Sequence, residues 1–254
     1  MFNNTPLLGE NVIFTGIQRS SEASDLVKRY GGSAVIAPMI ATKEIVSPRD
    51  LDLLQSFNSY DWLIFTSQSS VEAFYSKMVK YQLDASFFTA KIAVVGTKTA
   101  NAIENLGLSV DFTPSTFSAD IFVREFPTVA SLMDRCLFVK GNLAKDTITA
   151  GLQNDVDEWT IYETVELEEN KELIKTLLMS EESCSIIFTS PSTAEFFHRS
   201  IGASFGYENI TVCAIGHITK KFLESKKVSV QVMPDTYTLS DVIVKLAEWK
   251  GRVQ

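Results

Sequence analysis

Histidine and cysteine are scarce in this chain, which has two histidines and three cysteines among 254 residues. Two histidines exclude a histidine-rich metal site. The cysteines are odd in number and none belongs to a C-x-x-C pair; each stands beside an apolar, strand-like run, at Cys136, Cys184 and Cys213. We expect buried, reduced thiols and no metal, and hence a cytoplasmic protein.

Long apolar runs and an excess of positive charge are also missing. No stretch approaches the roughly 20 apolar residues of a transmembrane helix, and no N-terminal signal pattern is evident. The formal net charge is −8, and such a surface repels nucleic acid and anionic membranes. We expect neither as a partner, although local N–H donors and a few cations can still bind an acidic small molecule.

The familiar catalytic motifs are absent as well. There is no G-x-S-x-G elbow, no P-loop and no G-x-G-x-x-G after a strand. Serine hydrolysis, phosphoryl transfer and hydride transfer therefore lose support. What remains is chemistry that depends on positioning and hydrogen bonding.

An internal duplication is the most informative feature that the sequence does contain. IFTSQSSVEAF begins at Ile64 and returns as IFTSPSTAEFF at Ile187, an offset of 123 residues. A second matched pair of segments ends at Pro114 and Pro234, an offset of 120 residues. Weaker pairs match NVIFTG with CLFVKG and AVIAPMIAT with EWTIYETVE. Four blocks in the same order indicate two related halves.

Each half has five short apolar runs that alternate with amphipathic stretches such as residues 70–81 and 99–106. Runs of Val, Ile and Phe bounded by Gly, Ser, Thr or Pro are typical of parallel strands buried on both faces. The alternation predicts an α/β fold of two similar, doubly wound parallel-sheet domains. The expected strands are Val12–Thr15, Ala34–Ala37, Trp62–Phe65, Ile92–Val95, Val110–Phe112, Leu137–Val139, Trp159–Tyr162, Ser185–Phe188, Val212–Ile215 and Ser229–Val232.

Two arrangements of these halves are open. A simple tandem would divide the chain near residues 126–133. Alternatively, the chain crosses between the domains twice, after Pro38 and after Tyr162, where ATKEIVSPRD and ETVELEENKE are polar and charged as linkers are. The pattern of residues does not choose between them.

Ser, Thr and Gly gather at the expected carboxyl ends of the strands, where open α/β sheets bind ligands. Hydroxyls and free N–H groups at helix N-termini bind anions, although helix capping alone explains Ser and Thr at any one loop. Six such loops together favour a cleft for a polyanionic ligand. The candidate binding residues are Thr15, Ser67, Gln68, Ser69, Gly96, Thr97, Thr99, Gly141, Asn142, Ser190, Pro191, Ser192, Gly216, His217 and Thr219.

Three single residues call for separate treatment. His198 falls within an expected helix and is interpreted as a surface or packing residue, whereas His217 either lines the cleft or simply belongs to its loop. Tyr162 ends an expected strand, and a phenol, protonated at neutral pH, can donate to a departing oxygen. Taken alone, Tyr162 is better explained as an amphipathic strand-end residue with its hydroxyl in water.

The segments IFTSQSSVEAF, AVVGTKTANAIENLG, TIYETV, IFTSPSTAEFF and AIGHIT, in this order, resemble the uroporphyrinogen-III synthase family over about residues 12–244. The resemblance implies two α/β domains of flavodoxin-like strand order that face each other across a cleft. It also implies that the first domain is discontinuous. The expected parts are a domain of residues 1–38 and 166–254, an inserted domain of residues 43–160, and a two-stranded linker of residues 39–42 and 161–165.

The resemblance also implies a reaction. The family cyclises linear hydroxymethylbilane with loss of water and inversion of the last pyrrole ring, through a spiro intermediate, to give uroporphyrinogen III in heme biosynthesis. The substrate supplies its own electron-rich pyrroles, so no cofactor is implied, and its eight carboxylates suit strand-end N–H groups and hydroxyls. The enzyme's task is then one of geometry and entropy.

Residue roles follow from the same resemblance. Tyr162 matches a tyrosine thought to assist departure of the hydroxyl, and the cleft-lining Ser and Thr positions match Ser67, Thr99, Ser190 and Thr219. The chain departs from the family pattern at one place: many members have Thr-Arg at the end of the first strand, whereas here Gly16 follows the threonine. Arg19 can reach the same space from the loop and is therefore a further candidate.

Two other functions stay open from the sequence. One is a non-catalytic cytoplasmic two-domain protein that binds a polyanionic ligand, and the other is a different carbon–oxygen lyase acting on another polyacid. We expect a monomer, because no exposed apolar helix or heptad pattern is evident. A transient contact with hydroxymethylbilane synthase, which supplies the unstable substrate, is left open.

Overall fold

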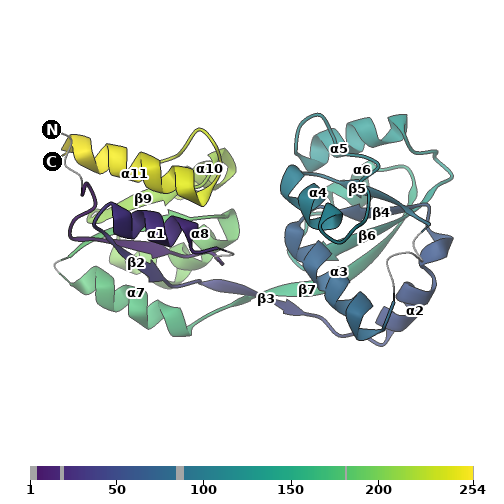
Figure 1. Cartoon of the computed structure of the whole chain (residues 1–254), viewed down its shortest axis with the longest axis horizontal. Helices are drawn as coiled ribbons and strands as arrows, with labels where there is room; N and C mark the ends of the chain where they lie inside the picture. The colour runs from purple at the N-terminus through teal and green to yellow at the C-terminus, as the bar shows by residue number, and fades with distance from the viewer. Residues whose placement is uncertain (1–4, 18–19, 84–88, 181, 254) are drawn as a thin grey trace. The chain divides into compact units, whose positions relative to one another are not determined.

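The chain forms two compact units, one of them continuous in sequence and the other not (Figure 1). The computed structural model describes all residues except 1–4, 18–19, 84–88, 181 and 254. Unit 1 consists of Met1–Ala41 and Val165–Gln254, and unit 2 is Thr42–Thr164. Among the described helices, none combines the length and apolar composition needed to cross a membrane.

Unit 1 is a parallel sheet with the strand order β2-β1-β8-β9 and helices on both faces. Its strands are β1 (Glu10–Phe14), β2 (Ser33–Ile36), β8 (Ser183–Phe188) and β9 (Ile210–Ala214). Its helices are α1 (Glu22–Arg29), α7 (Glu169–Met179), α8 (Pro191–Phe197), a π-helical turn (His198–Gly202), α9 (Ala203–Phe205), α10 (His217–Ser225) and α11 (Leu239–Val253).

Alternate residues of these strands pack on opposite faces of the sheet. Ile13 and Phe188 lie in one apolar cluster with α7, α8 and α10. Phe14 and Ile187 lie in the other cluster, with α1 and α11. Burial on both sides therefore explains the near-continuous apolar sequences of β1, β8 and β9.

Unit 2 repeats this design around the order β3-β7-β6-β4-β5. Its strands are β3 (Ile40–Glu44), β4 (Trp62–Phe65), β5 (Lys91–Val94), β6 (Arg135–Gly141) and β7 (Asp155–Glu166). The first two residues of β3 and the last two of β7 belong to unit 1. Its helices are α2 (Arg49–Gln55), α3 (Gln68–Lys80), α4 (Thr97–Glu104), α5 (Ala119–Glu125) and α6 (Thr147–Gly151), with short 3₁₀ turns at Phe57–Ser59 and Phe126–Thr128. Apolar clusters again fill both faces, with α2, α3 and α4 on one side and α5 and α6 on the other.

The duplication read from the sequence is also present in the topology. When β6, β7, β4 and β5 are matched with β1, β2, β8 and β9, the orders β7-β6-β4-β5 and β2-β1-β8-β9 become the same. A fifth position follows in both sheets, where Phe112 bridges to Ala93 and Val232 bridges to Cys213. The predicted fold class, two similar doubly wound sheets of flavodoxin-like order, is confirmed.

Two of the expected strands were wrong in extent. Residues 110–112 and 229–232 each contribute one isolated bridge. The side chains of Asp111 and Gln231 explain this, because each accepts a hydrogen bond at 2.8 Å from the main-chain N–H of the adjacent strand, at Ile92 and Val212 respectively. A side-chain oxygen thus takes the place of a ladder carbonyl, and regular pairing stops.

The strand that carries Tyr162 is longer than expected. β7 continues from Asp155 to Glu166, where the sequence predicted Trp159–Tyr162. It is hydrogen-bonded to β3, which overlaps residues 39–42, expected to form one strand of a two-stranded linker. Tyr162 therefore lies within a strand and not at its end.

Candidate functional site

In unit 2, the carboxyl end of β4 leads into α3 through Ser67. The Ser67 Oγ accepts a hydrogen bond of 3.1 Å from the main-chain N–H of Ser70 and so caps the helix. Gln68 and Ser69 form its first turn and are half-buried. The same Ser67 Oγ lies 3.1 Å from the hydroxyl oxygen of Tyr162. Ser67 is therefore both a helix cap and a hydrogen-bond partner of the tyrosine.

An irregularity in strand pairing sets the direction of the Tyr162 ring. Lys140 pairs with Thr160, but Gly141 pairs with Tyr162, so β7 contains one extra residue, Ile161. Such bulges bend a strand and re-aim a side chain. The ring lies against Gly141 so closely that a Cβ there would overlap it and come within 2.6 Å of its hydroxyl oxygen. Glycine is required at this position by the tyrosine.

Asn142 fastens the same loop to β7. Its main-chain N–H donates to the Tyr162 carbonyl at 3.0 Å, and its Oδ1 accepts from the Thr164 N–H at 2.9 Å. Four residues that the sequence predicted separately come together where β4 and β6 end and beside the bulge in β7: Ser67, Gly141, Asn142 and Tyr162.

The next loop of unit 2, after β5, begins α4 without a side-chain cap. Gly96 is the N-cap, with extended backbone, and Thr97 in the first turn is exposed. Thr99 is buried, and its N–H donates to the Gly96 carbonyl at 3.0 Å. The N-cap residue of α4 thus supplies no side-chain cap, an arrangement that suits an anionic ligand group.

Unit 1 carries the duplicate of these two loops. Ser190 caps α8 in a reciprocal capping box with Thr193, and Pro191 occupies the first turn with the half-buried Ser192. Gly216 is the N-cap of α10, again without a side-chain cap, and Thr219 is buried in the first turn. Both Phe-Thr-Ser segments are therefore true helix caps.

His217, in the loop after β9, has a partner that the sequence did not predict, Tyr237. His217 Nδ1 lies 3.0 Å from the Tyr237 hydroxyl, and the Tyr237 ring is near enough to Gly216 that a Cβ there would lie 3.1 Å from it. The internal repeat points to this position, because Tyr237 follows Pro234 by three residues as the aromatic Phe117 follows Pro114. His198, by contrast, is half-buried with its Nδ1 3.2 Å from the Tyr207 hydroxyl.

At the end of β1, the structure shows how the predicted residues are used locally. The Thr15 hydroxyl is buried and donates to the Ile187 carbonyl at 2.7 Å. A Cβ on Gly16 would overlap the Thr189 hydroxyl as that side chain is placed here. Arg19 lies outside the described residues.

The sequence of the chain matches the model of one protein family. The model of the family described as uroporphyrinogen-III synthase HemD matches residues 21–243. The chain belongs to the uroporphyrinogen-III synthase family. The resemblance seen in the sequence is thereby confirmed.

Named members of the uroporphyrinogen-III synthase family match over most of their length. A putative uroporphyrinogen-III synthase of Methanocaldococcus jannaschii is 30% identical over 240 residues, covering 92% of this chain and 96% of that protein. The uroporphyrinogen-III synthase of Synechococcus elongatus is 26% identical, covering 96% and 97%. The family indicates an enzyme with a function in porphyrin biosynthesis.

Solved uroporphyrinogen-III synthases share the fold. A mutant form of the Thermus thermophilus protein superimposes with a TM-score of 0.71 at 16% identity, covering 96% of this chain and 99% of that one. The Helicobacter pylori protein has a TM-score of 0.60, also at 16% identity, with coverage of 94% and 98%. At this identity the likeness supports the architecture alone.

Proposed function

We propose that the chain is a carbon–oxygen lyase that cyclises linear hydroxymethylbilane to uroporphyrinogen III, releasing water and inverting the last pyrrole ring. The observation that carries the proposal is the Tyr162 hydroxyl, which lies 3.1 Å from the Ser67 Oγ at the carboxyl end of β4. Membership of the uroporphyrinogen-III synthase family supplies the reaction class.

In the first step, the Tyr162 hydroxyl donates its proton to the departing hydroxyl of the bilane. The carbon–oxygen bond breaks with both electrons going to oxygen, water leaves, and the neighbouring pyrrole stabilises the cation as an azafulvene. The Ser67 hydroxyl can then donate to the phenolate oxygen of Tyr162. A hydrogen bond to a charged acceptor is stronger than one between neutral groups, so this contact stabilises the enzyme at the point where it has lost its proton.

In the following steps, the substituted carbon of the last ring attacks the cation and forms the spiro intermediate. That intermediate fragments and recloses with the ring inverted, and the proton lost when the macrocycle regains its aromatic pyrroles returns to Tyr162. No other reagent is consumed, because the pyrroles supply the electrons. The reaction as proposed needs no cofactor.

Binding of the carboxylates is assigned to the strand-end loops of each unit. The N-termini of α4 and α10 begin at Gly96 and Gly216, which have no side chain to occupy the first N–H groups. Those N–H groups and the positive ends of the helix dipoles favour anionic groups. We further propose that the protein acts as a monomer in the cytoplasm. The reducing conditions there suit its three buried free cysteines.

A product assay tests the proposal. Hydroxymethylbilane closes to the type I isomer without a catalyst, so the purified chain is supplied with freshly made hydroxymethylbilane and the two isomers are separated by chromatography after oxidation. We expect the type III isomer to predominate. Product that is only type I would overturn the proposal, and saturable binding of the bilane without turnover would indicate a binding protein instead.

A further inference from the structure

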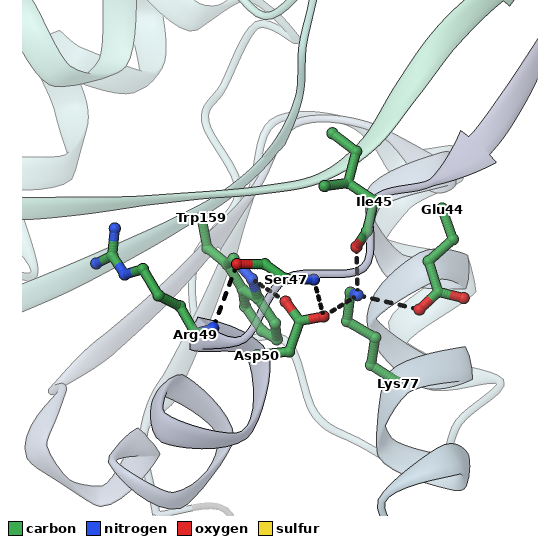
Figure 2. Close-up of polar contacts among 7 residues, drawn as sticks. All are labelled: Glu44, Ile45, Ser47, Arg49, Asp50, Lys77 and Trp159. Atoms are coloured by element: carbon green, nitrogen blue, oxygen red, sulfur yellow. Dashed lines mark hydrogen bonds and ion pairs between the residues drawn. The ribbon is translucent and has the colours of Figure 1, made fainter.

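A fully buried ion pair lies in unit 2 between α2 and α3 (Figure 2). The Lys77 Nζ is 2.6 Å from the Asp50 Oδ2, and both side chains are at most 1% exposed. The ammonium also donates to the Glu44 Oε1 at 3.0 Å and to the Ile45 carbonyl at 2.6 Å. These three contacts use all three donors of the lysine.

Asp50 is satisfied as completely as Lys77. Its Oδ1 accepts from the Trp159 indole N–H at 3.0 Å, and its Oδ2 accepts from the Ser47 main-chain N–H at 3.0 Å. Phe57 and Phe74 pack around the same indole. Lys77 and Asp50 are thus held inside an apolar part of the core that is rich in aromatic residues, with the part-exposed Glu44 as a third charge.

Stability alone does not explain a buried pair of this kind. Desolvation of two charges offsets most of their attraction, and apolar replacements of similar volume are often no less stable. Buried charges do, however, favour one arrangement of the surrounding backbone over others in some proteins. The elements that this pair joins therefore indicate what it does.

Two of its contacts lead directly to the bulge in β7. Trp159, bonded to Asp50, lies two residues before the extra residue of the bulge, Ile161. The Ile161 carbonyl accepts from the Ile45 N–H at 2.9 Å, and the Ile45 carbonyl is bound by Lys77. The next residue after Ile161 is Tyr162.

The helix α3 joins the same strand at a second point. Ser67 at its N-cap contacts the Tyr162 hydroxyl, and Lys77 lies ten residues further along the helix, roughly 15 Å at the rise of an α-helix. β7 is therefore attached to α3 at both positions, once through the hydroxyl of the tyrosine and once through the buried ion pair.

We propose that Lys77 and Asp50 are positioning residues for Tyr162: they hold the bulge of β7 in the one register that directs the tyrosine ring over Gly141 towards Ser67. They touch no substrate. This inference rests on the proposed role of Tyr162, and it adds two residues, remote from the strand-end loops, on which that role depends.

The test is a kinetic double-mutant cycle between the ion pair and the tyrosine. The pair variant Lys77→Met with Asp50→Asn removes both charges, keeps similar volumes and leaves an amide oxygen for the Trp159 N–H. In the parent, Tyr162→Phe is expected to lower kcat by about 10²-fold. The pair variant by itself is expected to have a kcat about tenfold or more below that of the unaltered protein, with a KM within about threefold of it. Displacing a catalytic group lowers the rate more than it weakens substrate binding. Adding Tyr162→Phe to the pair variant should cost only a few-fold more.

A matched control separates positioning from general destabilisation. Phe126→Leu weakens the apolar cluster on the opposite face of the same sheet, so Tyr162→Phe in that background should retain its full cost. If the pair variant fails to fold, Trp159→Phe is used instead, since it removes the indole N–H that links Asp50 to β7 and leaves the ion pair itself in place. An equal cost of Tyr162→Phe with and without the pair would overturn the inference. The inference would also be overturned if Tyr162→Phe left kcat of the otherwise unaltered protein unchanged. If the unaltered protein makes only the type I isomer, it is the proposed function that is wrong.

Discussion

The hydroxyl oxygens of Ser67 and Tyr162 lie 3.1 Å apart, although 95 residues separate them in the chain. Ser67 Oγ also accepts from the Ser70 N–H and lies 3.1 Å from the Ser70 hydroxyl. Its own hydrogen can therefore point at Ser70 while Tyr162 is protonated and turn to Tyr162 once that proton is gone. The helix cap and the proposed proton donor form one hydrogen-bonded unit.

Removing the phenolic hydroxyl tests that unit. Tyr162→Phe should lower the rate of type III formation by about 10²-fold while costing only about 1 kcal/mol of unfolding free energy, the usual value of one hydrogen bond. The matched control is Tyr207→Phe, because Tyr207 also lies against a glycine, Gly202, and bonds one partner, His198. The control should lose similar stability and no activity. Wild-type turnover by Tyr162→Phe would remove the tyrosine from the mechanism.

A methyl group at position 141 should displace the same ring without changing it. In Gly141→Ala, the new Cβ would overlap the Tyr162 ring, so the ring must move away from Ser67. We expect a loss of rate of roughly 10–10²-fold and a loss of stability of about 1–3 kcal/mol. Gly251→Ala is the control, because a Cβ there meets only the Pro6 side chain at 3.8 Å within α11, and stability should stay level or rise by up to about 1 kcal/mol. Full activity in Gly141→Ala would contradict the assigned contact.

The buried carboxyl of Asp50 predicts a pH dependence of stability. Burial on its own raises the pKa of Asp50, but the hydrogen bonds from Lys77, Ser47 and Trp159 outweigh it and hold the pKa below its usual value. A carboxyl with a lowered folded-state pKa stabilises the fold above the unfolded-state pKa of about 3.9, and this contribution is lost as the pH falls through the lower, folded-state pKa.

Asp50→Asn removes the titrating group. Urea unfolding of the parent and of Asp50→Asn should therefore differ by a constant free energy between about pH 7 and pH 5, and the difference should shrink below about pH 4. A difference that stays constant down to pH 3 would show that this carboxyl keeps the same pKa in the folded and unfolded chains.

The three thiols should be inert in the folded protein. Burial, followed by nearby carboxylates, raises the pKa of Cys136 to about 12 and also raises the pKa values of Cys184 and Cys213. Because the thiolate is the reactive form, a disulfide reagent at pH 8 should label the native protein slowly and all three cysteines rapidly in denaturant. Fast labelling of any one thiol in the native state would contradict its burial.

The repeat in the sequence was enough to predict both sheets, because strands buried on two faces leave continuous apolar runs that survive duplication. It overestimated residues 110–112 and 229–232, since the polar side chains of Asp111 and Gln231 form bonds that an apolar pattern does not record. Thr15 is a similar case at a single residue. A threonine at a strand end is suited to ligand binding, but the sequence does not record that its hydroxyl donates to the Ile187 carbonyl within the sheet.

Other features depended on pairing between distant segments. The sequence offered Ser67 and Tyr162 as separate candidates, and their contact requires the extra residue at Ile161 in β7. A bulge arises from the register of two strands and leaves no local signature. Lys77 and Asp50 were likewise unremarkable in the sequence, because their burial is decided by α2, α3 and β7 together.

The division of the chain into units also bears on the order in which they fold during synthesis. Unit 2 is a single stretch from Thr42 to Thr164, so the whole of it emerges from the ribosome before β8 and β9 of unit 1 do. During that interval β1 lacks the neighbour on one side that β8 later provides, and an unpaired strand edge readily recruits other strands. We therefore expect unit 2, with Ser67 and Tyr162, to fold before the sheet of unit 1 can be completed.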